Sequence, residues 1–227
     1  GFTEGTGGLL REHGLLEARD AWQADAAAQA AWLTQLDVPP AWCAARRISL
    51  FAYENPAVPG LFAQWARGQE QTCVLVPPGR VLASLPGGAA AWPVGRVWQD
   101  GALCVVIVPF GDQDAYDRLL WSCDLNFVRG EDSFVRAQWA ARPLVWHIYP
   151  QEDGAHAAKL AAFLRLYAAS PTVVALHEAW NAGRVPDWVK VEDELAGWQA
   201  RAKCWSAELA SGPELVQSLV EMVQVHV

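Results

Sequence analysis

The sequence predicts an α/β protein built on a Rossmann-like parallel sheet with flanking helices. Short apolar runs alternate with amphipathic segments between residues 47 and 147, as in chains that wind a parallel sheet. Residues 103–108 form a near-continuous apolar run, which is typical of a strand covered on both faces. Residues 116–123 carry apolar side chains at the i, i+3, i+4 and i+7 spacing of a helix face. From residue 156 onward the pattern is helical, so helices are expected to follow the sheet.

Each expected element follows from its local pattern. A helix over 17–36 is rich in Ala and Leu and is stopped by Pro39-Pro40. Ser170-Pro171 supplies an N-cap and a first-turn proline for a later helix that Gly183 ends. Right-handed crossovers between the strands would give the Rossmann-like topology. The expected strands are 47–53, 71–76, 103–108, 125–128 and 144–147, and the other expected helices are 112–123, 133–140, 156–167, 186–210 and 213–227, with one more through Leu61 and Trp65.

The expected organisation has three parts. Residues 1–44 form a connecting segment and a helix, residues 45–210 form the Rossmann-like domain, and residues 211–227 form a C-terminal amphipathic helix. The chain begins Gly1-Phe2-Thr3, without Met and without a basic or apolar leader, so we expect an internal piece of a longer protein that is not secreted.

Composition excludes several classes of protein. The net charge of -8 argues against a general nucleic-acid binder, which needs a basic surface. No apolar stretch approaches the roughly 18 residues of a transmembrane helix, so no membrane partner is expected. The five cysteines lack the paired spacing of a zinc site and suit a reducing, cytoplasmic setting, where each is expected to be buried and structural. The tryptophans at helical positions are expected in the core.

Residues 124–139 predict a strand, a glycine turn and a helix. The strand ends at Arg129, Gly130 breaks it, and Asp132 and Ser133 are suitable helix N-caps. The free N–H groups and the positive dipole end of such a helix form an anion site, for which a diphosphate is the obvious ligand. A capped turn with no ligand is the alternative interpretation.

Other strand ends carry side chains suited to a nucleotide. In an open parallel sheet, ligands bind beyond the carboxyl ends of the strands. The residues expected there include aromatic rings for a base and amides for its edge. Glu131 and Asp132 would repel a diphosphate and are expected to face sugar hydroxyls, whereas Arg129 and Arg136 could offset the phosphate charge, although Arg136 could also face solvent. His147 is interpreted as a hydrogen-bonded core or rim residue. The strand-end candidates are Phe51, Tyr53, Glu54, Phe110, Asp112, Gln113, residues 129–133, His147, Tyr149 and Gln151.

Residues 116–139, whose centre reads Asn126-Phe127-Val128-Arg129-Gly130-Glu131-Asp132-Ser133, resemble the signature of the EarP family. Members of this family are protein-arginine rhamnosyltransferases that modify bacterial elongation factor P. Residues 1–12, 51–56 and 146–151 are similar to the same family. The resemblance implies a GT-B fold of two facing Rossmann-like domains, with inversion at the sugar carbon. It also implies TDP-β-L-rhamnose as donor, an arginine of elongation factor P as acceptor, and residues 45–210 as the donor-binding half.

The resemblance also implies roles for individual residues. Phe51, Tyr53 and Phe110 would hold the base and donor with Gln113 beside them, and Glu131, Asp132 and Ser133 would bind the diphosphate-sugar end. Glu131 would also be catalytic. Arg129, Gly130 and Gln151 complete the expected substrate-binding set, with neither a cofactor nor a metal.

The aspartates that place the acceptor guanidinium in this family belong to a Gly-Asp-containing segment that these residues lack. A guanidinium is a poor nucleophile while protonated, so this piece is expected to bind donor without turnover. Two alternatives remain open, namely an interaction module that binds no nucleotide and a GT-B donor domain for UDP or GDP sugars. The C-terminal helix is a possible dimerisation surface.

Overall fold

The computed structural model describes residues 8–151 and 154–212 of the 227-residue chain. The helix expected at 213–227, and with it the dimerisation surface, lies outside the described residues. Six strands form one sheet in the order β3-β4-β2-β1-β5-β6. All neighbours pair in parallel except β3 and β4, which are antiparallel. The strands are β1 Arg46–Leu50, β2 Thr72–Val76, β3 Val97–Asp100, β4 Leu103–Ile107, β5 Leu125–Arg129 and β6 Leu144–His147.

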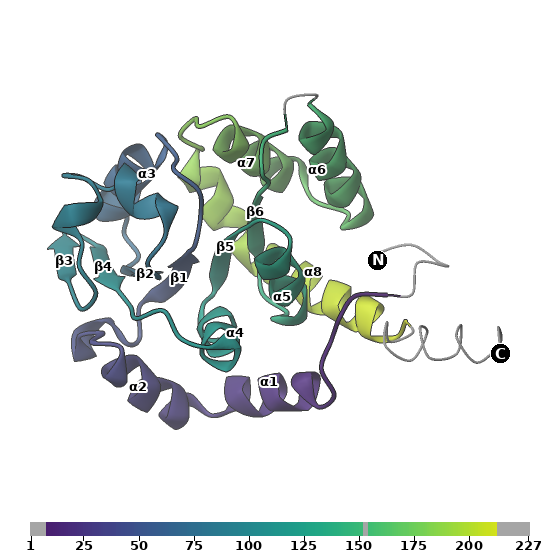
Figure 1. Cartoon of the computed structure of the whole chain (residues 1–227), viewed down its shortest axis with the longest axis horizontal. Coiled ribbons are helices and arrows are strands. Elements are labelled where there is room, and N and C mark those ends of the chain that lie inside the picture. Colours follow the sequence, from purple (N-terminus) through teal and green to yellow (C-terminus); the bar gives the residue numbers. More distant parts are fainter. Residues whose placement is uncertain (1–7, 152–153, 213–227) are drawn as a thin grey trace.

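The described helices follow the predicted alternation with the strands. Before the sheet come α1 and α2, between strands come α3, α4 and α5, and after the sheet come α6, α7 and α8 (Figure 1). The α/β fold predicted from the sequence is therefore confirmed. The bounds are α1 Leu15–Ala24, α2 Ala26–Gln35, α3 Val58–Arg67, α4 Gln113–Ser122, α5 Asp132–Trp139, α6 Ala155–Leu166, α7 Pro171–Asn181 and α8 Trp188–Ala210, with short 3-10 turns η1 Pro40–Trp42, η2 Arg80–Ser84 and η3 Ala89–Ala91.

The central strands bury both faces, as the unbroken apolar runs predict. Val74 and Val76 of β2 pack in a cluster with α3, whereas Cys73 and Leu75 pack on the other side with Leu33 of α2 and with α4. This alternation is the two-residue period of a strand. Helices therefore cover both faces of the sheet, and only its edges and the ends of its strands are open to ligands.

The predicted single helix over 17–36 is wrong. The chain forms two helices that are separated at Asp25, whose carboxylate accepts a hydrogen bond from the N–H of Ala28 at 2.8 Å. An aspartate that caps the next helix interrupts the preceding one. The division into a connecting segment and helix over 1–44, a domain over 45–210 and a helix over 211–227 stays a prediction. Leu15 of α1 packs in the main core cluster, and Leu33 of α2 packs in the second one.

The expectation of buried cysteines is confirmed for three of the five. Cys73, Cys104 and Cys123 are buried as expected, but Cys43 is half-buried and Cys204 is exposed. Trp65, Trp121 and Trp139 are buried in the core as predicted.

Within residues 8–151 and 154–212, no group of His, Cys, Asp or Glu side chains could hold a metal ion. None of the helices in that same part of the chain has the length and apolar character needed to cross a bilayer.

The turn at Gly101 makes a prediction about stability. Gly101 has φ +53, and a Cβ there would lie 2.2 Å from the carbonyl oxygen of Ala66. Gly101→Ala is therefore expected to lower the free energy of unfolding by about 2 kcal/mol or more. Gly197→Ala is the matched control, because a Cβ at that position of α8 meets nothing within 4 Å, and it should raise stability by about 0.5–1 kcal/mol. Urea unfolding of both variants measures the difference, and equal effects would contradict the close approach.

Candidate nucleotide site

The strand order places the candidate site at the carboxyl ends of β1 and β5. From β1 the chain builds β2 and β4 on one side, and then crosses to build β5 and β6 on the other. The loops that follow β1 and β5 therefore leave in opposite directions, which opens a crevice between them. Phe51 and Tyr53 follow β1, and Arg129 ends β5. Parallel register aligns these two strands from Ile48 with Leu125 to Leu50 with Phe127, so the three side chains meet at one edge.

The guanidinium of Arg129 lies against two aromatic rings at this edge. Its Cζ is 4.5 Å from the ring centroid of Phe51 and 5.1 Å from that of Tyr53. Both contacts are within the range of a cation–π interaction. Arg129 Nε is buried and has no hydrogen-bond partner in the described part of the chain. The two rings therefore orient a positive charge whose hydrogen-bonding capacity is not fully used.

The turn from Arg129 into α5 has the geometry of an anion site, although its caps differ from those predicted. Gly130 has φ +63, and a Cβ added at this position would lie 3.4 Å from the hydroxyl oxygen of Tyr53. Glu131, rather than Asp132 or Ser133, is the N-cap residue, and its side chain makes no capping hydrogen bond. Ser133 instead donates its hydroxyl to the carbonyl oxygen of Arg129 at 2.8 Å. Without a side-chain cap, the first N–H groups of the helix are available to an anionic ligand.

A cavity of about 570 Å³ lies next to this turn. It brings together six of the predicted strand-end candidates from three separate segments of the chain. Phe51 and Phe110 supply ring surface, with centroids 6.1 Å apart, and Phe110 is 63% exposed. The cavity is lined by Leu10, Phe51, Phe110, Gly111, Asp112, Gln113, Tyr116, Asp132, Ser133, Val135 and Arg136.

The other strand-end candidates do not line this cavity. Tyr53 packs edge-on against Tyr149, with ring centroids 5.7 Å apart. Glu131 is exposed and forms an ion pair with Lys159 of α6 at 2.6 Å. Gln151 is also exposed, and its N–H donates to Nδ1 of His156 at 3.0 Å. The predicted set is therefore divided between the cavity and a rim that continues toward α6.

His147 is a core residue at this rim. Its ring packs between Tyr53 and Trp180, at centroid distances of 5.2 and 5.7 Å. Burial lowers the pKa of His147 to about 4, so the ring is neutral at pH 7. The predicted hydrogen bond is not made at Nδ1, which has no partner among the described residues.

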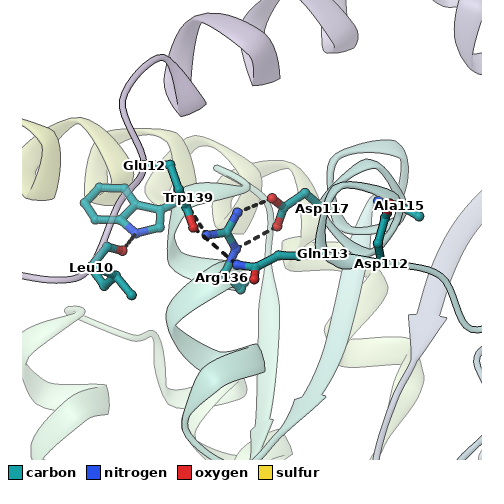
Figure 2. Close-up of polar contacts among 8 residues, drawn as sticks. All are labelled: Leu10, Glu12, Asp112, Gln113, Ala115, Asp117, Arg136 and Trp139. Carbon is teal, nitrogen blue, oxygen red and sulfur yellow. Dashed lines mark hydrogen bonds and ion pairs between the residues drawn. The ribbon is translucent and has the colours of Figure 1, made fainter.

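Arg136 does not face solvent. The side chain is buried, and its guanidinium forms two hydrogen bonds with the carboxylate of Asp117 on α4, the one from Nε to Oδ1 measuring 2.8 Å. It forms a further ion pair with Glu12 (Figure 2). Burial by itself would lower the pKa of Arg136, but the two carboxylates raise it above its ordinary value. Arg136 is therefore charged, and its charge is already matched within the protein.

The two acids in this cluster respond differently to it. Burial raises the pKa of Asp117, and Arg136 opposes that shift only in part. For Glu12, burial would raise the pKa, but the hydrogen bond and charge of Arg136 hold it below its ordinary value. Glu12 belongs to the segment that precedes α1, which also reaches α5 through Leu10, whose carbonyl oxygen accepts from Nε1 of Trp139 at 2.9 Å. Leu10 of this segment lines the cavity.

Tyr116 and Leu10 line the cavity, although the sequence did not suggest either as a site residue. Tyr116 lies three residues after Gln113 on one helix face, a spacing that could have indicated it. No local signal connects Leu10 with α5, because the two are far apart in the sequence.

Comparison with known proteins decides the family. Residues 1–224 match the sequence profile of the "Elongation-Factor P (EF-P) rhamnosyltransferase EarP" family. The chain belongs to the EarP family. It is 49% identical over 231 residues to a protein-arginine rhamnosyltransferase of Pseudomonas aeruginosa, with 97% of this chain and 61% of that protein covered. A protein-arginine rhamnosyltransferase of Shewanella oneidensis is 38% identical, with 99% and 61% covered.

A solved structure agrees with this assignment. It concerns the structural basis for EarP-mediated arginine glycosylation of translation elongation factor EF-P, and it superposes with a TM-score of 0.86 at 40% identity. The match covers 100% of this chain and 75% of that chain. The EarP resemblance stated from the sequence is thus confirmed, and the present chain spans about three fifths of the length of the curated EarP relatives.

Proposed function

We propose that this chain supplies the donor site of an arginine rhamnosyltransferase and binds TDP-β-L-rhamnose at the carboxyl ends of β1 and β5. The observation that carries the proposal is the convergence of Phe51, Tyr53, Arg129 and Ser133 at the point where the strand order reverses. Such crevices are the usual ligand sites of open α/β sheets. Membership of the EarP family favours a nucleotide sugar as the ligand.

The diphosphate would lie at the start of α5. The uncapped N–H groups there and the Arg129 guanidinium together offset its negative charge. Phe51 and Phe110 would hold the thymine base, with Gln113 at its edge. Asp132 and Glu131 would face sugar hydroxyls, because carboxylates repel phosphate but accept hydrogen bonds from hydroxyls. In this arrangement the ion pair between Glu131 and Lys159 would break, and Glu131 would then act on the rhamnosyl group during transfer. No metal is required in this proposal.

Transfer to the acceptor would use more of the protein than these residues. The P. aeruginosa relative is a protein-arginine rhamnosyltransferase of which this chain matches 61%. We therefore propose an arginine of elongation factor P as acceptor for the whole protein, and donor binding without turnover for the present residues. An inverting transfer would need a carboxylate beside the guanidinium and a stabilised leaving TDP. The site at α5 would supply the second of these.

Calorimetric titration with TDP, UDP and GDP tests the proposal. TDP should bind saturably and more tightly than UDP, and burial of the thymine methyl group alone contributes about 0.8 kcal/mol, or about fourfold in affinity. Tyr53→Ala should weaken TDP binding by about 10-fold or more through loss of an aromatic contact to the ligand and to Arg129. Combining Glu131→Ala with Ser133→Ala should remove measurable binding. Val189→Ala, at a 66% exposed position of α8, is the control and should bind as the parent does.

The outcomes separate the two alternative functions. A folded chain that binds neither nucleotide would favour an interaction module. Tighter binding of UDP or GDP than of TDP would favour a donor domain for another nucleotide sugar.

A further inference from the structure

Arg136 joins three segments that surround the candidate donor cavity. It lies on α5, the helix whose first turn carries Asp132 and Ser133, and it lines the cavity itself. Its guanidinium contacts Asp117 on α4 and Glu12 on the segment before α1 (Figure 2). The contact with Glu12 spans 124 positions of sequence. One cavity-lining side chain therefore connects α5 with α4 and with the segment before α1.

The same guanidinium lies beside the amide of Gln113. With the amide oxygen turned toward Arg136, Oε1 accepts from Nη1 at 2.9 Å and from Nε at 3.2 Å. The opposite orientation places the amide NH₂ against guanidinium N–H groups, where both sides are donors. It gains only a 3.3 Å contact from Nε2 to Glu12. Arginine has hydrogen-bond donors and no acceptor, so Arg136 fixes the Gln113 oxygen toward itself. The amide N–H groups of Gln113 are then available to donate to a ligand in the cavity.

The charges around Arg136 also bear on an anionic ligand. Side chains of Asp117 and Arg136 are only 4% and 9% exposed, so their charges are poorly screened by water. Asp117 and Glu12 do not line the donor cavity, but both contact Arg136, which does. Without the guanidinium, their two carboxylates would be left without this cation, one side chain away from the cavity that would take a diphosphate. Arg136 thus neutralises acids that would otherwise oppose donor binding.

We propose that Arg136 is a positioning residue of the donor cavity, which orients the Gln113 amide for the nucleotide and keeps Asp117 and Glu12 from repelling it. The proposal rests on the proposed function, because it assigns Arg136 a role at the same site. Arg136 acts through Gln113 and need not touch the ligand. A purely structural ion pair would stabilise the fold and leave the affinity of the folded protein unchanged.

A double-mutant cycle on the full 227-residue chain, with TDP as the probe, tests this role. Arg136→Lys keeps the charge but lacks the planar fork, and it is expected to weaken TDP binding by about 10-fold. Gln113→Ala should weaken it by a similar factor. The double variant should bind no more weakly than Gln113→Ala alone, because the two residues act in series. Arg118→Lys is the matched control, since Arg118 is exposed on α4, the helix that carries Gln113, and lies outside this cavity.

Thermal unfolding of each variant separates positioning from stability. If Arg136→Lys lowers the melting temperature and leaves the TDP affinity unchanged, or if its effect adds in full to that of Gln113→Ala, the positioning role is overturned. If Arg136→Lys does not fold, Asp117→Asn is titrated with uncharged thymidine in place of TDP, because this variant leaves Arg136 in place and removes the carboxylate that orients it, and an uncharged probe does not respond to the change in charge. Weaker thymidine binding is expected, and unchanged binding overturns the positioning role. A parent chain that fails to bind TDP overturns the proposed function and this role together, whereas a binding parent with an unaffected variant overturns this role alone.

Discussion

Replacing Arg129 by glutamine is expected to lower the affinity for TDP about 30-fold. Arg129 ends β5 immediately before the uncapped start of α5, and its buried Nε has no partner in residues 8–151 or 154–212. Two rings already orient the guanidinium, so it can bind a diphosphate without rearrangement. Hydrogen bonds to charged groups contribute about 2 kcal/mol, which corresponds to this change in affinity. Calorimetric titration of the folded variant measures it.

The control for this substitution is Arg67→Gln. Arg67 is exposed in the last turn of α3 and does not belong to the cavity lining, so its loss changes the net charge equally without removing a contact. TDP affinity of this control should stay within about twofold of the parent value, because exposed charges at a distance are screened. Equal losses in the two variants would mean that overall charge, and not the position of Arg129, governs binding.

Acidification is expected to destabilise the protein through His147 and His177, which are both buried. Burial lowers the pKa of His147 and of His177 to about 4, compared with 6.5 for an accessible imidazole. The folded state therefore keeps both rings neutral at pH values where the unfolded chain binds protons. Their contribution is fully present above pH 6.5 and is lost as the pH falls toward 4, at about 3 kcal/mol for each histidine.

His177→Gln isolates one of these contributions. His177 is fully buried in α7, and its Nδ1 lies 2.8 Å from the carbonyl oxygen of Val173. Urea unfolding at several pH values from 7 to 4.5 should show a smaller loss of stability in this variant than in the parent, whatever its stability at pH 7. The exposed His13 provides the control, and His13→Gln should keep the parental pH dependence. An unchanged slope in His177→Gln would contradict a neutral buried imidazole.

Strong local patterns were sufficient to predict most of the fold. The apolar run at 103–108 became β4, and the turn from β5 into α5 lies where Gly130 predicted it. The edge strand β3 was missed because its side chains are mostly exposed and do not alternate, although Asp100-Gly101 is a hairpin signal. Asp25 was likewise a visible N-cap inside the predicted helix over 17–36. In both cases the local signal was present and the longer pattern concealed it.

The sequence predicted only the part of the candidate site that lies within one continuous segment. The run from Arg129 to Ser133 lies at the strand end, as its sequence indicated. The pairing of Arg136 with Glu12 depends on contacts across 124 residues, which no local pattern reveals. The ion pair of Glu131 with Lys159 depends in the same way on where α6 packs. Tertiary contacts thus decide which charged side chains already form ion pairs within the protein.

The eight residues of α5 are held along their whole length. Phe134 stacks on Trp146 with ring centroids 3.8 Å apart, and Gln138 accepts a hydrogen bond from the indole of Trp205 at 2.6 Å. At the far end, the carbonyl oxygen of Trp139 accepts from Arg19 at 2.9 Å. The helix therefore loses its conformational freedom during folding and not during ligand binding. A ligand at its first turn meets N–H groups that are already preorganised, so little ordering entropy has to be offset by the binding contacts.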